Sequence, residues 1–567
     1  MNLWRRFERL LHRHVRVCLL ALLITQTGLL AWIALENSPV ADEIGHLPAG
    51  ISHWRYQKFD LYRVNPPLVR SVAAIPVLFS DCIEDWQHYK SASLQREEFQ
   101  VGRSFVSANG YRFFHYVSMA RLACIPFSLI GTLVCFSWAK ELSGRRSGFL
   151  ASAMWVFSPN ILAHGSLITS DAAAASTGVF AAYMFCRWLK KPTGIRAFVA
   201  GVVLGLCVLT KTTWLILFAV WPAIFITSCI LRHNVMTRSH GLQLSGLLLS
   251  GLYVLNFGYL FEGSMTPLGS YQFKSRALVG ETAGSNDAPR RGNRFSDSIT
   301  GSIPVPLPRN FVEGIDLQKY DFEEGQPSYL RGEWRDHGWS YYYLYALAVK
   351  VPLGTGSIFA LTIVSVCSTA IRKRAFRSED LTLLLPPFSV FLLASFQLGF
   401  NKHLRYVLPI FPFLFVIASI SLKQLDTKRF RFGRVLIFIM LLWSAVSSLA
   451  VCPANLAYFN ELAGGPENGA KHLLGSNLDW GQSLIALKRW NAARTDSLPL
   501  YVSYSGLFDP SNVGISCHPV PITNSPPAGW YAISMNRLFG YERLPAIFRI
   551  RSPAKVLEYS MAIFLIE

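Results

Sequence analysis

Apolar runs of about 20 residues recur along this chain, and they limit its fold more than any other feature. A helix needs about 20 apolar residues to cross a bilayer, and 51% of the 567 residues are hydrophobic. The sequence therefore predicts a mainly α-helical, polytopic membrane protein with about eleven transmembrane helices. The two short spans on either side of Lys211 could instead form one broken helix. The expected spans are 17–36, 115–138, 147–164, 167–189, 197–212, 213–231, 241–260, 353–371, 381–400, 404–421 and 433–451.

The basic residues indicate how the chain is oriented in its membrane. The net charge is +20, and 23 Lys and Arg against five acids fall in the segments that are inside if the N-terminus is cytoplasmic. This is the positive-inside pattern, which predicts a cytoplasmic N-terminus in the inner (cytoplasmic) membrane and an outer C-terminus. Because topology accounts for the charge, nucleic acid is not an expected partner. The basic start and first apolar run are interpreted as an uncleaved anchor.

The expected outer parts are long enough to carry function. They are the loops 37–114 and 261–340, which belong to a membrane domain of residues 1–451, and an extracytoplasmic domain of residues 452–567. Within the first loop, the apolar run 65–80 is too short to span and contains Arg70, which favours an interfacial or re-entrant helix. In the last region, a helical pattern through "NGAKHLLGSNLDWGQSLIALKRW" precedes three strand-like segments, so a small α/β domain is expected.

Several ionisable residues are expected at the outer membrane surface. An ionisable group at membrane depth is costly, so each needs a partner or a task. Acids beside several cations would suit an anionic lipid headgroup next to a base. The residues are Asp42, Glu43 and His46 after the first span, Asp171 at the start of the fourth, Lys211 between two short spans, and Lys350 and Arg405 at outer helix ends.

Five segments of this chain resemble one family of membrane enzymes. They are "ADEIGH", "NPPL", "LTK", "LRYVLPIFP" and, above all, "AYFNELAGGPENGAKHLLGSNLDWGQSL". In this order they look like bacterial C-fold (GT-C) membrane glycosyltransferases of the dolichyl-phosphate-mannose–protein mannosyltransferase-like family. The lipid A aminoarabinose transferase is a more distant relative. The resemblance runs from the first span to about Trp490.

The resemblance implies an inverting glycosyltransferase that moves a sugar from a polyprenyl-phosphate carrier to an acceptor hydroxyl outside the cytoplasm. It implies that the Asp42–Glu43 pair holds the catalytic carboxylate, which would accept the proton of the attacking hydroxyl. Two adjacent helical residues cannot both face one substrate, so the choice between them stays open. Asp171 is a candidate second catalytic carboxylate. The other interpretation of Asp42 and Asp171 is that they cap their helices.

The candidate substrate-binding residues are His46, Lys211, Lys350 and Arg405. The cations would balance charge on the leaving phosphate, or Lys211 and Arg405 could simply extend to the interface as surface side chains do. No cofactor is expected to be required. A divalent metal is compatible with His46 and His53, but two histidines at this spacing do not predict one.

The expected partners are a polyprenyl-phosphate-sugar donor, membrane lipids, and a protein, lipid or glycan acceptor. Two other functions remain open at this point, a lipid or solute transporter (flippase) and a membrane sensor with an outer binding domain. Transporters commonly have inverted repeats with matching interrupted helices, and the sequence shows no such symmetry. A sensor would not require acids in the first outer loop.

Overall fold

The computed structural model describes most of the chain. It covers residues 14–90, 96–231, 238–280, 292–370, 378–424, 432–523, 525–540 and 544–567. The basic start at 1–13 and the basic connections 232–237, 371–377 and 425–431, on which the expected orientation partly rests, lie outside these ranges.

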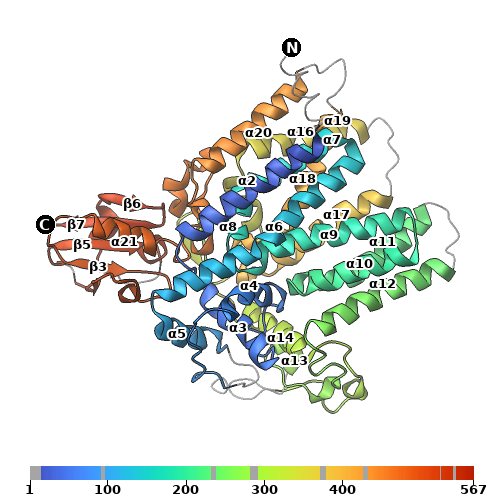
Figure 1. The fold of residues 1–567 in the computed structure, drawn as a ribbon, viewed down its shortest axis with the longest axis horizontal. Coiled ribbons are helices and arrows are strands. Elements are labelled where there is room, and N and C mark those ends of the chain that lie inside the picture. The colour runs from blue at the N-terminus through green and yellow to red at the C-terminus, as the bar shows by residue number, and fades with distance from the viewer. Residues whose placement is uncertain are drawn as a thin grey trace.

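A layered array of apolar helices makes up most of the molecule, and a small sheet lies at one end of it (Figure 1). Every expected span overlaps one or more of these helices, which confirms the mainly α-helical fold class. The helices of the array are α2 (Val15–Glu36), α6 (Arg112–Ser143), α7 (Arg145–Val156), α8 (Pro159–Gly165), α9 (Ser170–Lys190), α10 (Gly194–Val208), α11 (Leu217–Leu231), α12 (Arg238–Phe257), α16 (Leu353–Ala370), α17 (Ser378–Phe396), α18 (Phe411–Ser419), α19 (Ser421–Gln424) and α20 (Gly433–Leu449).

By length and hydropathy alone, three helical segments of the described chain could cross a membrane. They are Val15–Glu36, Arg112–Ser143 and Thr212–Ile230, and the bent pair Tyr342–Lys350 and Leu353–Ser365 adds a fourth if it counts as one span. Five further apolar helices are shorter. The protein is thus a multi-pass membrane protein, and the number of eleven crossings stays a prediction.

One expected span is interrupted, and the chain also breaks between the two spans around Lys211 and bends before the span 353–371. The span 147–164 is wrong as one helix, because it breaks before Pro159, whose ring nitrogen cannot donate to a preceding carbonyl. Around Lys211 the chain leaves α10, becomes extended (φ −155°, ψ 132°), and makes the 3-10 turn η1 (Thr212–Ile216) before α11. Helix α15 (Tyr342–Lys350) meets α16 at an angle of 118°.

The outer loops are mostly helical. The first contains α3 (Glu43–Tyr56), α4 (Leu68–Leu78) and α5 (Glu98–Asn109), and α4 packs against α3 and α6 as a short amphipathic segment. The second contains the short helix α13 (Arg276–Val279), the longer α14 (Arg309–Glu324), and a hairpin of β1 (Ser328–Leu330) and β2 (Glu333–Arg335).

The C-terminal region carries a five-stranded mixed sheet in the order β4-β3-β5-β7-β6. Strand β3 pairs in parallel with β4 and β5, while β7 pairs antiparallel with β5 and β6. The helix α21 (Leu484–Ala492) lies beside the sheet (Figure 1). The strands are β3 (Leu500–Ser503), β4 (His518–Pro519), β5 (Gly529–Ser534), β6 (Lys555–Leu557) and β7 (Met561–Ile566), with the short helices α22 (Met535–Leu538) and α23 (Ile547–Ile550) between them.

The expected long helix before this sheet is wrong over most of its length. Only its last part forms α21, and residues 466–477 make separate 3-10 turns. The glycines Gly475 and Gly481 have φ values of +66° and +91°, in the region where a right-handed helix cannot continue. The segment is therefore a folded loop, and this loop contacts the candidate site.

Candidate active site

Glu43 is completely enclosed and fully hydrogen-bonded. Its Oε1 accepts from Arg121 Nε at 2.9 Å and from the Ile168 amide at 3.1 Å. Its Oε2 accepts from Arg121 Nη2 at 2.6 Å and from the Val40 amide at 2.8 Å. A carboxylate has about four lone-pair positions, so Glu43 has no acceptor site left for a substrate hydroxyl.

Arg121 is equally occupied. Besides Glu43, its guanidinium donates to the carbonyl oxygens of Ala34, Asn37 and Ser38 at 2.7 to 2.9 Å. All five guanidinium N–H groups are thus bonded. Since Arg121 lies on α6, the pair ties the loop between α2 and α3 to the helix array. Its role in the structure is to hold the segment that carries Asp42.

Asp42 differs from Glu43 in both its hydrogen bonds and its exposure. It occupies the N-cap position of α3, but its side chain makes no capping hydrogen bond. Its Oδ2 accepts from Arg405 Nη1 at 2.9 Å, and the side chain is 20% exposed. The capping interpretation therefore lacks the bond that defines it. Asp42 keeps acceptor capacity and access, which Glu43 does not.

A second acid lies within reach of the same arginine. Asp171, in the first turn of α9, accepts from Lys211 Nζ at 2.7 Å through Oδ1, while its Oδ2 lies 3.7 Å from Arg405 Nη1. Asp171 makes no hydrogen bond as the N-cap of α9, whose cap residue is Thr169. Arg405 thus bridges Asp42 and Asp171, and the four side chains form one cluster of two acids and two cations.

Packing of Trp214 fixes Lys211 against Asp171. Trp214 lies in η1, donates from Nε1 to the Ala174 carbonyl on α9 at 2.8 Å, and is fully buried. A Cβ at Gly178 would lie 1.9 Å from its ring, so only glycine allows this approach. The contact holds the break in the chain beside the start of α9, which is where Lys211 meets its acid.

The loop "SNLDWGQ" clamps both sides of the cluster. The Asn477 side chain accepts from the Leu404 amide at 2.8 Å and donates to the Lys402 carbonyl at 3.0 Å, which fixes the chain before Arg405. The Trp480 carbonyl accepts from the Ala41 amide at 3.1 Å, next to Asp42. The Trp480 ring lies 4.1 Å from the Arg405 guanidinium carbon. This stacking is a cation–π contact that orients Arg405.

Lys350, expected to bind the donor phosphate, bonds instead to backbone carbonyls. Its Nζ donates to the Leu456 carbonyl at 2.8 Å and to the Asn477 carbonyl at 2.6 Å, and it lies 4.5 Å from the centre of the Phe459 ring. The side chain is 3% exposed. These contacts hold the "SNLDWGQ" loop to the end of α15, and the geometry favours a structural role over phosphate binding.

His46 lies beside the cluster on α3. Its ring stacks on Tyr62, with centroids 4.3 Å apart, and burial lowers the pKa of His46 well below its usual value. The imidazole is therefore neutral. His53, two turns further along the same helix, accepts from Arg70 Nε at 2.7 Å and contacts the Lys58 carbonyl at 2.7 Å. Within the described ranges, no group of three or more His, Cys, Asp or Glu residues is arranged to hold a metal.

Buried polar atoms without partners gather around these residues. Across the part of the chain that the structure describes, five such atoms belong to side chains in or next to the cluster. They are His46 Nδ1, Arg70 Nη1, His164 Nδ1, Thr169 Oγ1 and Arg405 Nε. A buried polar atom without a partner costs about 1–3 kcal/mol. Such a concentration is expected where a polar ligand completes the hydrogen bonds.

Three of these residues, Arg70, His164 and Thr169, were not predicted as site residues from the sequence. Arg70 is 1% exposed, and no carboxylate pairs with it in the described chain. From the sequence, Arg70 was used only as evidence that the apolar run 65–80 does not span the membrane. His164 ends α8 and lies against Trp480, with ring centroids 6.3 Å apart. An ionisable residue inside an expected span is itself a signal of function, and it could have identified His164.

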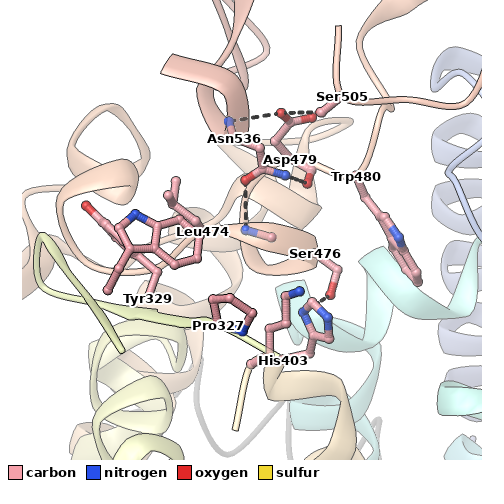
Figure 2. A pocket seen from close by; sticks show the side chains of 12 residues that line it. Pro327, Tyr329, His403, Leu474, Ser476, Asp479, Trp480, Ser505 and Asn536 are labelled. Atoms are coloured by element: carbon pink, nitrogen blue, oxygen red, sulfur yellow. Dashed lines mark hydrogen bonds between the residues drawn. The ribbon is translucent and has the colours of Figure 1, made fainter. Parts of the chain in front are cut away.

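A cavity of about 270 Å³ opens next to the cluster. It lies between the hairpin of β1 and β2, the segment before Arg405, the "SNLDWGQ" loop and the sheet region. Figure 2 shows Tyr329 at one end and Trp480 at the other, with His403 and Asp479 between them. Since Trp480 also stacks on Arg405, the cavity and the cluster share this ring.

Residues 113–256 match the family model described as Dolichyl-phosphate-mannose-protein mannosyltransferase. The resemblance inferred from the motifs is thereby confirmed for this segment, which includes Arg121, Asp171 and Lys211. No curated protein matches this chain. The assignment of individual roles to the site residues stays a prediction.

Two solved structures are similar along most of the chain. ArnT from Cupriavidus metallidurans bound to undecaprenyl phosphate has 12% sequence identity and a TM-score of 0.45, over 96% of this chain and 97% of ArnT. The oligosaccharyltransferase AglB from Archaeoglobus fulgidus, in complex with an inhibitory peptide and a dolichol-phosphate, has 11% identity and a TM-score of 0.43. That match covers 93% of this chain and 70% of AglB.

Proposed function

We propose that this protein is an inverting glycosyltransferase that moves a sugar from a polyprenyl-phosphate carrier to an acceptor hydroxyl on the outer face of the membrane. The observation that carries the proposal is the Asp42 carboxylate, accessible and held by Arg405, in a cluster surrounded by buried polar atoms without partners. The family model that matches residues 113–256 is named for a sugar donor of this class.

Asp42 acts as the general base. The acceptor hydroxyl loses its proton to the carboxylate as its oxygen forms a bond to the anomeric carbon, and the bond from that carbon to the phosphate oxygen breaks. Direct attack on one face of the sugar inverts the configuration. The leaving lipid phosphate is a stable anion, because the second pKa of a phosphate monoester is about 6, so no general acid is needed.

Arg405 and Lys211 stabilise the charge that grows on the leaving phosphate. Arg405 already uses Nη1 for the two acids, but its Nε is buried without a partner and can donate to a phosphate oxygen. Asp171 holds Lys211 in place through the 2.7 Å ion pair. Asp171 thus acts on the donor through Lys211 and Arg405, whereas Asp42 acts on the acceptor.

Donor binding by the purified full-length protein tests this proposal. We expect Arg405→Ala to weaken binding of a synthetic polyprenyl phosphate by about tenfold or more, because charge-assisted bonds to phosphate contribute about 1.5–3 kcal/mol. Arg112→Ala is the matched control, since Arg112 pairs with Asp81 on the surface and is 48% exposed. Equal affinity of wild type and Arg405→Ala would contradict the assignment of Arg405.

The proposed orientation has its own test. The N-terminus is expected on the cytoplasmic side, with Asp42, Gly280 and the C-terminal sheet outside. A cysteine introduced at Gly280 should react with a membrane-impermeant thiol reagent in intact cells, in a background where accessible native cysteines are replaced. Labelling of that cysteine only after lysis would place the cluster on the wrong side for this reaction.

A further inference from the structure

The cavity next to Trp480 is lined by aromatic rings that are fixed in position. Tyr329 and Trp334 are cross-strand partners in the hairpin of β1 and β2, with ring centroids 5.2 Å apart. The Tyr329 hydroxyl donates to the Ala470 carbonyl at 2.7 Å, and Trp334 Nε1 donates to the Phe539 carbonyl at 2.9 Å. Because their polar ends are tethered, both residues present ring faces at little further cost in side-chain entropy.

The polar part of the lining is neutral overall. It contains one cation, Lys402, and one carboxylate, Asp479. Burial raises the pKa of Asp479, which accepts from Ser505 Oγ at 2.7 Å and from the Asn536 amide at 3.3 Å (Figure 2). It also accepts from the Gly481 amide at 3.1 Å. The Ser534 side chain also bonds to Asp479, so the carboxylate is fully occupied by the protein and supplies charge rather than a free acceptor.

Two ring nitrogens in the lining are available to a ligand. His403 bonds through Nδ1 to Ser476 Oγ at 2.8 Å, and within the described ranges its Nε2 has no hydrogen-bond partner. Among the same residues, Trp480 Nε1 has none either, and neither nitrogen is among the fully buried atoms. The lining thus combines ring faces with isolated donor and acceptor groups, as small-molecule sites do.

We propose that this cavity binds a neutral carbohydrate, and that the acceptor of the reaction is therefore a hydroxyl of a glycan. The proposal rests on the proposed function. A sugar ring presents C–H groups that pack on aromatic faces and hydroxyls that both donate and accept. A lining with one positive and one negative group selects neither a phosphorylated nor a strongly acidic ligand.

The position of the cavity relative to Asp42 makes it an acceptor site. Trp480 lines the cavity, stacks on Arg405 at 4.1 Å, and its carbonyl bonds to the residue before Asp42. One sugar unit in the cavity would leave the next unit of the same chain beside Arg405. Its hydroxyl would then reach the Asp42 carboxylate, while the donor phosphate occupies the other side of the cluster at Lys211.

Ligand-observed NMR with the detergent-solubilised full-length protein tests this inference. The probes are maltotetraose, mannotetraose and chitotetraose, together with a Ser/Thr-containing peptide. We expect saturable binding of at least one oligosaccharide, weakened about tenfold by Trp334→Ala and by Trp334→Leu, because both changes remove the aromatic face on which the sugar ring packs. Trp443→Ala is the control, because that half-exposed tryptophan lies on α20 and bonds to Glu461.

Each outcome decides the question. No oligosaccharide binding, binding that is unchanged in both Trp334 variants, or binding of the peptide alone would overturn the carbohydrate assignment. Binding of a synthetic polyprenyl phosphate is measured on the same preparations. If that lipid binds and no sugar does, only the present inference fails, whereas absence of lipid binding in the wild type would count against the proposed function itself.

Discussion

Asp42→Asn should leave donor binding intact and reduce sugar transfer by about 10²- to 10⁴-fold, the usual contribution of a general base. The amide keeps the shape of the side chain, and its oxygen can still accept from Arg405 Nη1, now at 2.9 Å from Asp42 Oδ2. It cannot accept the proton of the attacking hydroxyl. The loss should therefore appear in kcat, because the donor site around Lys211 and Arg405 is preserved.

Release of polyprenyl phosphate from a synthetic polyprenyl-phosphate hexose, in the presence of envelope glycans, measures this effect. Asp81→Asn is the matched control in the same outer loop, because Asp81 is a surface acid paired with Arg112 and 76% exposed. Folding should be unaffected in both variants, as Asp42 makes no helix-capping bond. Transfer by Asp42→Asn at close to the wild-type rate would rule out Asp42 as the base.

The helices were predictable because their signal is local. An apolar run of sufficient length specifies a membrane helix whatever surrounds it, and every expected span overlaps at least one helix, although the span 147–164 is split in two. The breaks were partly predictable for the same reason, since the sequence already raised a broken helix around Lys211. The long helix expected before the sheet failed, because its apolar spacing is helical while Gly475 and Gly481 adopt positive φ. Periodicity does not report a glycine's φ.

The choice between Asp42 and Glu43 could not be made from the sequence. The two acids are adjacent in the sequence, and what distinguishes them is the contact of Glu43 with Arg121, which is 78 residues away along the chain. Lys350 shows the same limit. A lysine at an expected outer helix end looks available to a phosphate, but the carbonyls that it bonds are 106 and 127 residues away. Only tertiary contacts show which charges are already satisfied.

Removing either member of the Glu43–Arg121 pair should destabilise the protein rather than its chemistry. Breaking a buried ion pair from one side costs about 3–5 kcal/mol, because the remaining charge is left buried without its partner. Here Glu43 is 0% and Arg121 1% exposed, and either change also frees hydrogen bonds that hold the loop before Asp42. Arg121→Ala and Glu43→Gln should therefore lower the melting temperature and the yield of folded protein.

Thermal unfolding in detergent measures this effect, with Arg112→Ala as the control for an exposed pair, where about 0–1 kcal/mol is expected. Transfer is then compared per unit of folded protein. Glu43→Gln should lose activity largely in proportion to its loss of folded protein, whereas Asp42→Asn should melt like the wild type and lose turnover. A Glu43→Gln variant that melts like the wild type and does not transfer sugar would move the catalytic base from Asp42 to Glu43.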